Sequence, residues 1–285
     1  MNYRHVTLPP GLYFVGTPIG SARDITLRAL DVLASADVIA AEDTRSLRRL
    51  LDIHGVPLNG RALVSYHDHS GAGARERLLR ALEQGQSVAY ASEAGMPLIA
   101  DPGYDLSRAA AEAGHMVTCA PGPSAVLTAL TLAGLPTDSF FFAGFLPSAA
   151  AARRKRLESL RDVPGTLVFY ESPKRAAASL ADMAAVLGEN RQAALCRELT
   201  KKFEEVRRAA LGDLAEIIKA LEPRGEIVIV VDRGRSEKIR EEDLESDLKR
   251  ALMDHSVRDA ADIVAGLHGV PRRKVYQMAL KLGKD

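Results

Sequence analysis

The sequence predicts an α/β protein with two α/β domains and a small helical C-terminal appendage. Short apolar runs alternate with segments of helical period from Leu12 to Val231, Pro121-Gly122-Pro123 interrupts this alternation, and the composition becomes strongly charged after Asp232. A length of 285 residues also fits two domains better than one. We therefore expect α/β domains at residues 11–120 and 121–232, followed by a charged linker and helical tail at 233–285.

Five short apolar runs and four helical segments make up the first predicted domain. The first run, residues 12–15, ends in a turn at residues 16–20, and Leu27, Leu30 and Leu33 then recur at helical spacing. The other strand candidates are residues 37–41, 63–66, 87–92 and 115–120. Three further helices are expected: one begins at Thr44, a second contains Leu78, Leu79 and Leu82, and a third ends at Gly114. This alternation favours a parallel sheet covered by helices.

The second predicted domain begins after Pro121-Gly122-Pro123, which can continue neither a helix nor a central strand. A helix is expected at residues 124–133, and strands of undetermined direction at 139–144, 166–171, 191–197 and 227–231, with helices between them. Two helical patterns follow the charged stretch at 233–249, one at residues 257–267 and one at 272–280. The break at Gly269-Val270-Pro271 between them suits a helix-turn-helix.

Charge and cysteine content exclude several classes of protein. The chain has 38 Lys and Arg against 37 Asp and Glu, a net charge of +1, so any nucleic-acid site must be local. Two cysteines are too few for a disulfide framework, which favours a reducing compartment. Because the N-terminus lacks a signal-peptide pattern and no stretch approaches about 18 apolar residues, we expect a cytoplasmic protein without a membrane role.

Polar loops follow several predicted strands, at residues 16–20, 42–45, 92–103 and 121–124. Open α/β sheets bind ligands at the carboxyl ends of their strands, so these loops should converge on one crevice. The 92–103 loop is dense in glycine, proline and carboxylates, which permit close backbone approach and acceptance from an amine or a ribose. A tight but inert loop is the alternative. Neither a Gly-x-Gly-x-x-Gly motif after a strand nor a P-loop motif is present in the sequence.

Eight short motifs occur in one order between residues 11 and 232. They are Gly16-Thr17-Pro18-Ile19-Gly20, Ala41-Glu42-Asp43-Thr44-Arg45, Ser65-Tyr66-His67, the loop from Glu93 to Gly103, Pro121-Gly122-Pro123-Ser124-Ala125, Gly144-Phe145-Leu146-Pro147, Phe169-Tyr170-Glu171-Ser172-Pro173 and Arg197-Glu198-Leu199-Thr200-Lys201. Together they resemble the tetrapyrrole (precorrin-like) methylases. Within that superfamily they are most similar to the members that methylate a cytidine ribose in the decoding centre of small-subunit ribosomal RNA.

The resemblance implies a homodimer of two-domain subunits, each with S-adenosylmethionine bound in the cleft between its α/β domains. Carried over position by position, the cofactor contacts would be Thr17, Pro18, Ser92, Glu93, Ala94, Gly95, Met96, Pro97, Pro121, Gly122 and Ser124. The chain departs from the usual family residues at four positions, with Ser21 for Asn, Glu93 for Asp, Met96 for Thr and Lys174 for His. Two of these departures, Glu93 and Met96, lie among the expected cofactor contacts.

Methyl transfer to a ribose 2′-hydroxyl requires in-line positioning and removal of a weakly acidic proton. The candidate bases are Glu171, His67, Lys174 and Lys201. Each has a structural alternative; Glu171, for example, could pair with Arg197 at the strand ends, and His67 could lie in a polar surface turn. The two histidines of His67-Asp68-His69 are too few ligands for a metal, so we expect no metal site.

Clusters of cations suit RNA phosphates better than a neutral small molecule. The candidate RNA contacts are Arg45, Arg153, Arg154, Lys155, Arg156, Arg175 and Lys202, and Lys174 and Lys201 could extend this surface. A solvated helix face is the alternative for residues 153–156. In the tail, Arg272, Arg273 and Lys274 could bind RNA or pack on a dimer partner.

These observations support one main hypothesis and two alternatives. The main hypothesis is an S-adenosylmethionine-dependent enzyme that methylates the 2′-hydroxyl of a cytidine in the 16S ribosomal RNA of the small ribosomal subunit. The first alternative is a tetrapyrrole or precorrin methyltransferase, which the cations at 153–156 disfavour. The second is a non-catalytic RNA-binding factor for ribosome assembly, suggested by the replacements at Glu93 and Met96.

Overall fold

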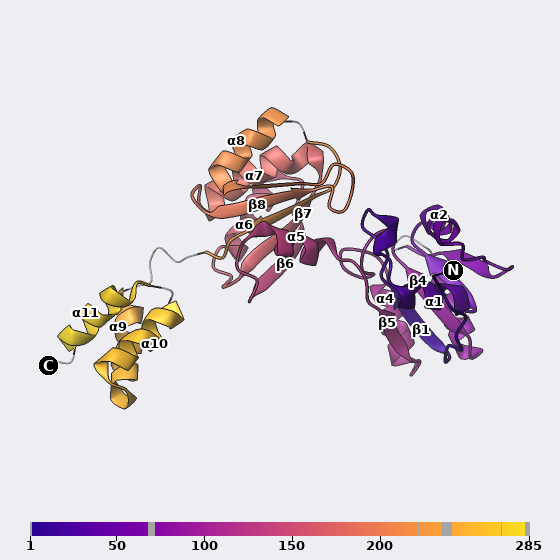
Figure 1. Cartoon of the computed structure of the whole chain (residues 1–285), viewed down its shortest axis with the longest axis horizontal. Helices are drawn as coiled ribbons and strands as arrows, with labels where there is room; N and C mark the ends of the chain where they lie inside the picture. Colours follow the sequence, from indigo (N-terminus) through magenta and orange to yellow (C-terminus); the bar gives the residue numbers. More distant parts are fainter. Residues whose placement is uncertain (1, 68–71, 222, 235–240, 269, 283–285) are drawn as a thin grey trace. The chain divides into compact units, whose positions relative to one another are not determined.

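The computed structural model describes residues 2–67, 72–221, 223–234, 241–268 and 270–282. The chain divides into two compact units, Met1–Gly234 and Arg235–Asp285 (Figure 1). Among the described residues, no helix is long and apolar enough to cross a membrane. The larger unit contains both predicted α/β parts, and the boundary expected between them at residue 121 stays a prediction.

The first sheet is parallel and has the strand order β3-β2-β4-β1-β5. Its strands are β1 (Gly11–Val15), β2 (Val38–Ala41), β3 (Ala62–Ser65), β4 (Ser87–Ala91) and β5 (Val117–Ala120). The connecting helices are the short 3-10 helix η1 (Ala22–Asp24), α1 (Leu27–Ser35), α2 (Thr44–His54), α3 (Ala72–Glu83) and α4 (Tyr104–Glu112). Helices α1 and α2 pack on one face and α3 and α4 on the other, which confirms the predicted helix-covered parallel sheet.

The second sheet is mixed and has the order β6-β7-β10-β8-β9. Its strands are β6 (Phe140–Phe145), β7 (Thr166–Glu171), β8 (Gln192–Arg197), β9 (Glu205–Ala210) and β10 (Ile227–Val231). Its helices are α5 (Ala125–Ala133), α6 (Ala150–Leu160), α7 (Pro173–Leu187) and α8 (Leu211–Leu221). Helix α5 packs on one face and α6, α7 and α8 pack on the other (Figure 1). The central strand β10 is buried along its whole length, as its apolar sequence predicts.

Strand β9 is an element that the sequence pattern did not reveal. It lies at the edge of the sheet, pairs with β8, and carries charged side chains, among them Glu205, Arg207 and Arg208. An edge strand with charged side chains resists unwanted pairing with other chains, but it lacks the apolar alternation by which strands are recognised.

In the described residues of the smaller unit, 241–268 and 270–282, three helices surround one apolar core. They are α9 (Glu241–Asp254), α10 (Val257–His268) and α11 (Arg272–Leu282), and the last two confirm the helical patterns expected near 257–267 and 272–280. The expectation of a charged linker is corrected at residues 241–249, which are helical. Leu244 and Leu248, one turn apart on α9, are buried in this core and account for the helix.

A buried ion pair joins α6 to α7. Arg153 donates from Nε to Oδ2 of Asp182 at 2.7 Å and from Nη1 to the Ser148 carbonyl at 3.0 Å. Arg154 donates to the other carboxylate oxygen at 2.6 Å. Burial tends to raise the pKa of Asp182, but the bonds from the two guanidinium groups outweigh it, so the pKa lies below its ordinary value.

Asp182→Asn is expected to lower the free energy of unfolding by about 3–5 kcal/mol, because it leaves the buried Arg153 charge uncompensated. Urea denaturation at neutral pH measures the loss. The matched control is Asp105→Asn, whose exposed pair with Arg108 should contribute less than about 1 kcal/mol. Because the folded pKa of Asp182 is depressed, the advantage of the wild type should shrink as the pH falls below about 4. Equal losses in the two variants would contradict this account.

Candidate functional site

The loops after β1 and β4 are joined by main-chain hydrogen bonds. The Thr17 N–H donates to the Gly95 carbonyl at 2.9 Å, and the Gly95 N–H donates to the Thr17 carbonyl at 3.1 Å. The buried Thr17 hydroxyl also donates to the Ser92 carbonyl at 3.3 Å. The two loops therefore form one structural unit at the carboxyl edge of the first sheet.

The loop after β5 packs directly against the loop after β1. A Cβ atom placed on Gly16 would lie 2.7 Å from the backbone nitrogen of Gly122 and 2.8 Å from its Cα, closer than real Cβ contacts. Gly122 in turn donates its N–H to the sulfur of Met96 at 3.2 Å. Glycine at both positions is what lets the two backbones approach this closely.

The loop after β2 reaches the same place. Glu42 accepts the backbone N–H of Glu93 at 3.3 Å, and the Ser46 hydroxyl donates to the Glu93 carboxylate at 3.4 Å. The predicted convergence of the loops at residues 16–20, 42–45, 92–103 and 121–124 is therefore present in the structure.

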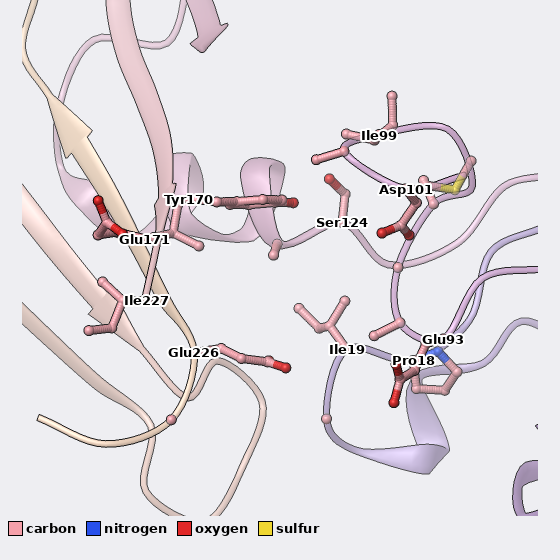
Figure 2. A pocket seen from close by; sticks show the side chains of 18 of the residues that line it. Pro18, Ile19, Glu93, Ile99, Asp101, Ser124, Tyr170, Glu171, Glu226 and Ile227 are labelled. Carbon is pink, nitrogen blue, oxygen red and sulfur yellow. The ribbon is translucent and has the colours of Figure 1, made fainter. Parts of the chain in front are cut away.

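The ends of several strands of the second sheet lie beside these loops. Strands β6 and β7 are parallel and β10 is antiparallel to β7 and β8, so the carboxyl ends of β6, β7 and β8 share an edge with the start of β10. In this register Ile227 lies opposite both Glu171 and Arg197. Residues from this edge and from the loops of the first sheet line a cavity of about 640 Å³. Figure 2 shows Tyr170, Glu171, Glu226 and Ile227 on one side, and Pro18, Ile19, Glu93, Ile99 and Asp101 on the other.

Carboxylates dominate the charge of the cavity. Among the described residues that line it, five are acidic, and the cation is Lys201; the acidic residues are Glu42, Glu93, Asp101, Glu171 and Glu226. Such a lining attracts a cationic ligand and repels phosphate.

Lys201 is held between two carboxylates. Its Nζ lies 3.0 Å from Oε1 of Glu198 and 2.9 Å from Oε2 of Glu226. Burial tends to lower the pKa of Lys201, but the bonds to Glu226 and Glu198 together outweigh it, so the pKa is raised. The ammonium form is thereby favoured, which opposes action as a base.

Glu171 lines the cavity, but its carboxylate is bonded within the protein. It accepts the Ser172 N–H at 2.7 Å and the Ser179 hydroxyl at 2.5 Å, and it pairs with Arg175 at 2.9 Å. The alternative pairing with Arg197 does not occur, since Arg197 bonds Glu205 at 3.0 Å. Glu171 therefore fixes the start of α7 at the wall of the cavity.

The other two base candidates are not among the residues that line the cavity. His67 is exposed after β3, and Lys174 is exposed in the first turn of α7. Asp68 and His69 lie outside the described residues. Within the described part of the chain, no group of three or more His, Cys, Asp or Glu could hold a metal ion.

Most of the expected cofactor contacts lie at the cavity or next to it. Those that line it are Pro18, Glu93, Ala94, Gly95, Met96 and Ser124. Thr17 and Ser92 line a smaller hollow of about 140 Å³, which shares Pro18 and Glu93 with the cavity. Pro97, Pro121 and Gly122 are not lining residues, and Gly122 supports the loops from behind.

The expected RNA contacts fall into two groups. The prediction that Arg153 contacts RNA is wrong, because its side chain is buried against Asp182 and cannot reach a phosphate in this structure. Arg175 is bonded to Glu171 and to the Leu146 carbonyl. The exposed members are Arg45, Arg154, Lys155, Arg156 and Lys202, of which Arg45 also pairs with Asp43 and Arg154 with Asp182.

Sequence reasoning missed the aromatic side chains at the second-sheet wall. Phe145 and Tyr170 both line the cavity, with ring centroids 5.5 Å apart. Burial, with the nearby charges of Asp101 and Glu226, raises the pKa of Tyr170 to about 12, so its hydroxyl stays protonated at neutral pH. The signal that could have revealed this wall is Gly144, an isolated glycine inside an aromatic strand.

Backbone strain is concentrated in two of the loops around the cavity. Leu98 and Ala100 have φ values of 70° and 60°, and Glu198 and Thr200 have values of 52° and 64°. Each lies in the left-handed region, which residues with a Cβ rarely adopt. Such strain is typical of functional loops.

Comparison with known proteins gives the family. The description "Tetrapyrrole (Corrin/Porphyrin) Methylases" fits residues 11–215, and "RsmI C-terminal HTH domain" fits residues 239–283. The chain belongs to the tetrapyrrole methylase family. The recognised motifs, the two-part α/β fold and the helical C-terminal unit are all consistent with that membership.

Two relatives of this methylase carry a more specific name. The chain is 46% identical over 276 residues to ribosomal RNA small subunit methyltransferase I of Mesorhizobium japonicum, across 96% of this chain and 93% of the relative. It is also 46% identical over 276 residues to the protein of the same name from Escherichia coli O157:H7, across 95% and 94%. A uroporphyrin-III C-methyltransferase from Thermus thermophilus, solved with S-adenosylhomocysteine, superposes with a TM-score of 0.54 and 19% identity, across 78% of this methylase and 97% of that chain.

Tyrosine titration tests the environment of the cavity wall. Subtracting the 295 nm titration of a Tyr170→Phe variant from that of the wild type should leave a component with a midpoint of about 12. The ordinary pKa of a tyrosine hydroxyl is about 10, so between pH 10 and 12 the unfolded state loses the Tyr170 proton while the folded state keeps it. The free energy of unfolding should therefore fall as the pH rises above 10. A difference component near pH 10 would mean that Tyr170 is solvated rather than buried at the wall.

Proposed function

We propose that this chain is an S-adenosylmethionine-dependent methyltransferase that methylates the 2′-hydroxyl of a cytidine ribose in the 16S ribosomal RNA of the small ribosomal subunit. The observation that carries the proposal is identity of 46% across almost the whole chain to proteins named ribosomal RNA small subunit methyltransferase I. The matched region includes both sheets and the C-terminal helices.

The residues at the cavity fit S-adenosylmethionine. Its net charge is positive, because a sulfonium and an ammonium outweigh one carboxylate, and this suits a lining rich in acidic side chains. Gly16 and Gly122 keep the backbones of two of the surrounding loops close together. The buried Ser92 hydroxyl has no hydrogen-bond partner within the described structure and could donate to a ligand. When bound, the cofactor supplies an electrophilic methyl group.

Positioning supplies most of the rate gain in this proposal. The loops of the first sheet would hold the methyl donor, and the strand ends of the second sheet would hold the ribose with its 2′-hydroxyl toward that donor. The bound cofactor would supply the methyl group, and the 2′-hydroxyl would lose its proton to a base or to water. Glu171, His67, Lys174 and Lys201 stay the candidate bases, although Glu171 and Lys201 are engaged in ion pairs.

RNA binding is proposed to use cations outside the cavity. Arg154, Lys155 and Arg156 are exposed on α6, and Lys202 is exposed next to Lys201. Phosphates bound there would remain outside the acidic lining. We also propose that the enzyme acts as a homodimer and that the α9–α11 unit contacts RNA or the ribosome.

The alternative of a tetrapyrrole substrate is not favoured by the cavity. Porphyrin and corrin precursors carry many carboxylate groups, which the acidic lining would repel even though Glu171 is paired with Arg175 and Glu226 with Lys201. The likeness to the uroporphyrin methyltransferase, at 19% identity, supports the fold and not the substrate. The alternative of a non-catalytic assembly factor predicts no cofactor binding and is tested next.

Gly16→Ala is expected to weaken S-adenosylmethionine binding by about tenfold or more, because its Cβ would push apart the loops at Gly16 and Gly122. Isothermal titration calorimetry measures the affinity. Gly73→Ala is the control, since a Cβ there meets nothing within 4 Å. No saturable heat with the wild type would favour the non-catalytic factor, and unchanged affinity in Gly16→Ala would show that this contact does not shape the cofactor site.

Methyl-labelled S-adenosylmethionine and small subunits from a strain that lacks this gene test the reaction itself. We expect label in an alkali-resistant dinucleotide, because a 2′-O-methyl group blocks alkaline cleavage of its own linkage. Subunits from a strain that carries the gene are the control and should accept little label. Label recovered in mononucleotides after alkaline hydrolysis would mean that the base, and not the ribose, is methylated. Transfer to a precorrin but not to RNA would favour the tetrapyrrole alternative.

A further inference from the structure

The exposed phenylalanines of β6 are unusual for a strand, and one of them lies at the cavity. Phe140, Phe141 and Phe145 are 43%, 38% and 57% exposed. Phe145 is the one of these three that lines the cavity, and it is the most exposed. A large apolar side chain left in water at the mouth of a site is available to a flat, apolar ligand surface.

A bulge in β6 determines where Phe145 points. Phe142 pairs with Val168, but Gly144 pairs with Phe169 and Phe145 with Tyr170, so the register shifts by one residue at Ala143. Without this shift, strict alternation would place Phe145 on the face opposite Phe142 and Tyr170. With the shift, Phe145 lies on the same face of the sheet as Phe142 and Tyr170. Gly144, with a φ of 67°, supplies the left-handed backbone at the bulge.

The bulge builds an aromatic cluster that holds Tyr170 in place. The rings of Phe142 and Tyr170 lie 4.9 Å apart, and those of Phe145 and Tyr170 lie 5.5 Å apart, at interplanar angles of 67° and 62°. Tyr170 is thus supported by two edge contacts. Figure 2 shows its ring extending from the second-sheet wall toward Ser124 and Asp101 across the cavity.

The charge of the lining limits what these rings can bind. Five carboxylates line the cavity, and Lys201 is already paired with Glu198 and Glu226, so a phosphate is disfavoured there. An uncharged aromatic ring is not disfavoured by this charge. Nucleic-acid enzymes that act on a single nucleotide commonly take it out of its stack and place the base against aromatic side chains.

We propose that the exposed ring of Phe145 is a stacking platform for the pyrimidine base of the target nucleotide, and that Tyr170, whose ring is inclined at 62° to it, supports this ring by an edge contact. The platform binds the base after it leaves the RNA stack, while the ribose of the same nucleotide faces the methyl donor and its phosphates remain outside the acidic lining. This inference rests on the proposed function and names the part of the site that receives the base.

The test compares Phe145→Leu with Phe141→Leu. Both remove an exposed ring from the same strand, but Phe141 does not line the cavity. For Phe145→Leu, kcat/KM with small ribosomal subunits should fall by about 5- to 150-fold, the range for loss of one base–aromatic stack. Phe141→Leu should stay within about twofold of the wild type, as expected for a surface change. Phe145→Tyr, which keeps a ring, should recover most of the loss.

Two further measurements distinguish base stacking by Phe145 from a role in cofactor binding or in a subunit contact. The affinity of Phe145→Leu for S-adenosylmethionine and its molar mass in solution should both equal those of the wild type. Gly144→Ala should also lose activity, because alanine is strained at a φ of 67° although nothing lies within 4 Å of its Cβ.

Several results would overturn the proposal. Unchanged kcat/KM in Phe145→Leu excludes the platform. Equal losses in Phe141→Leu and Phe145→Leu, or a changed molar mass, would assign the aromatic edge to a subunit contact. Weakened cofactor binding would assign Phe145 to the cofactor site. If the wild type binds the cofactor but labels no ribose, the proposed function fails first, and this inference fails with it.

Discussion

The approach of the Gly16 backbone to that of Gly122 is the constraint on which the site depends. It brings the loop after β1 against the loop after β5, while the paired hydrogen bonds between Thr17 and Gly95 fix the loop after β4. The next part of the same loop packs against the second sheet, because Ile19 is buried with α5, Val168 and Val228. One short segment, residues 16–20, therefore connects the two walls of the cavity.

A site built from main-chain contacts tolerates changes of side chain. The hydrogen bonds between Thr17 and Gly95 use backbone groups, and Glu93 is held in part by its own N–H, which donates to Glu42. Replacement of the usual family residues by Glu93 and Met96 leaves this framework in place. Met96 even adds to it, because its sulfur accepts the N–H of Gly122. The departures at these two positions are therefore compatible with an intact site.

The parts of the fold that follow from local pattern were predictable, and those that depend on distant partners were not. Strands β1, β4 and β10 are buried on both faces, so their apolar runs indicated them directly. The charged edge strand β9 has no such run, and the antiparallel directions of β8 and β10 leave no mark in their own sequences.

The same distinction applies to the site. Loops after parallel strands meet at a common edge for geometric reasons, so their convergence could be predicted from strand order alone. The role of Arg153 could not, because its partner Asp182 lies 29 positions away on another helix. Phe145 was missed because a one-residue register shift reverses the face on which it stands, and alternation along the chain does not show such a shift.

The left-handed residues Leu98, Ala100, Glu198 and Thr200 carry a consequence for evolution and engineering. Each holds a conformation that costs about 1–3 kcal/mol and that glycine adopts freely. Selection for heat resistance alone would favour relief of this strain, and the loops that surround the cavity would be the places where it is found. A more thermostable descendant of this chain would then risk a slower enzyme, because the strained segments are also those that shape its cleft.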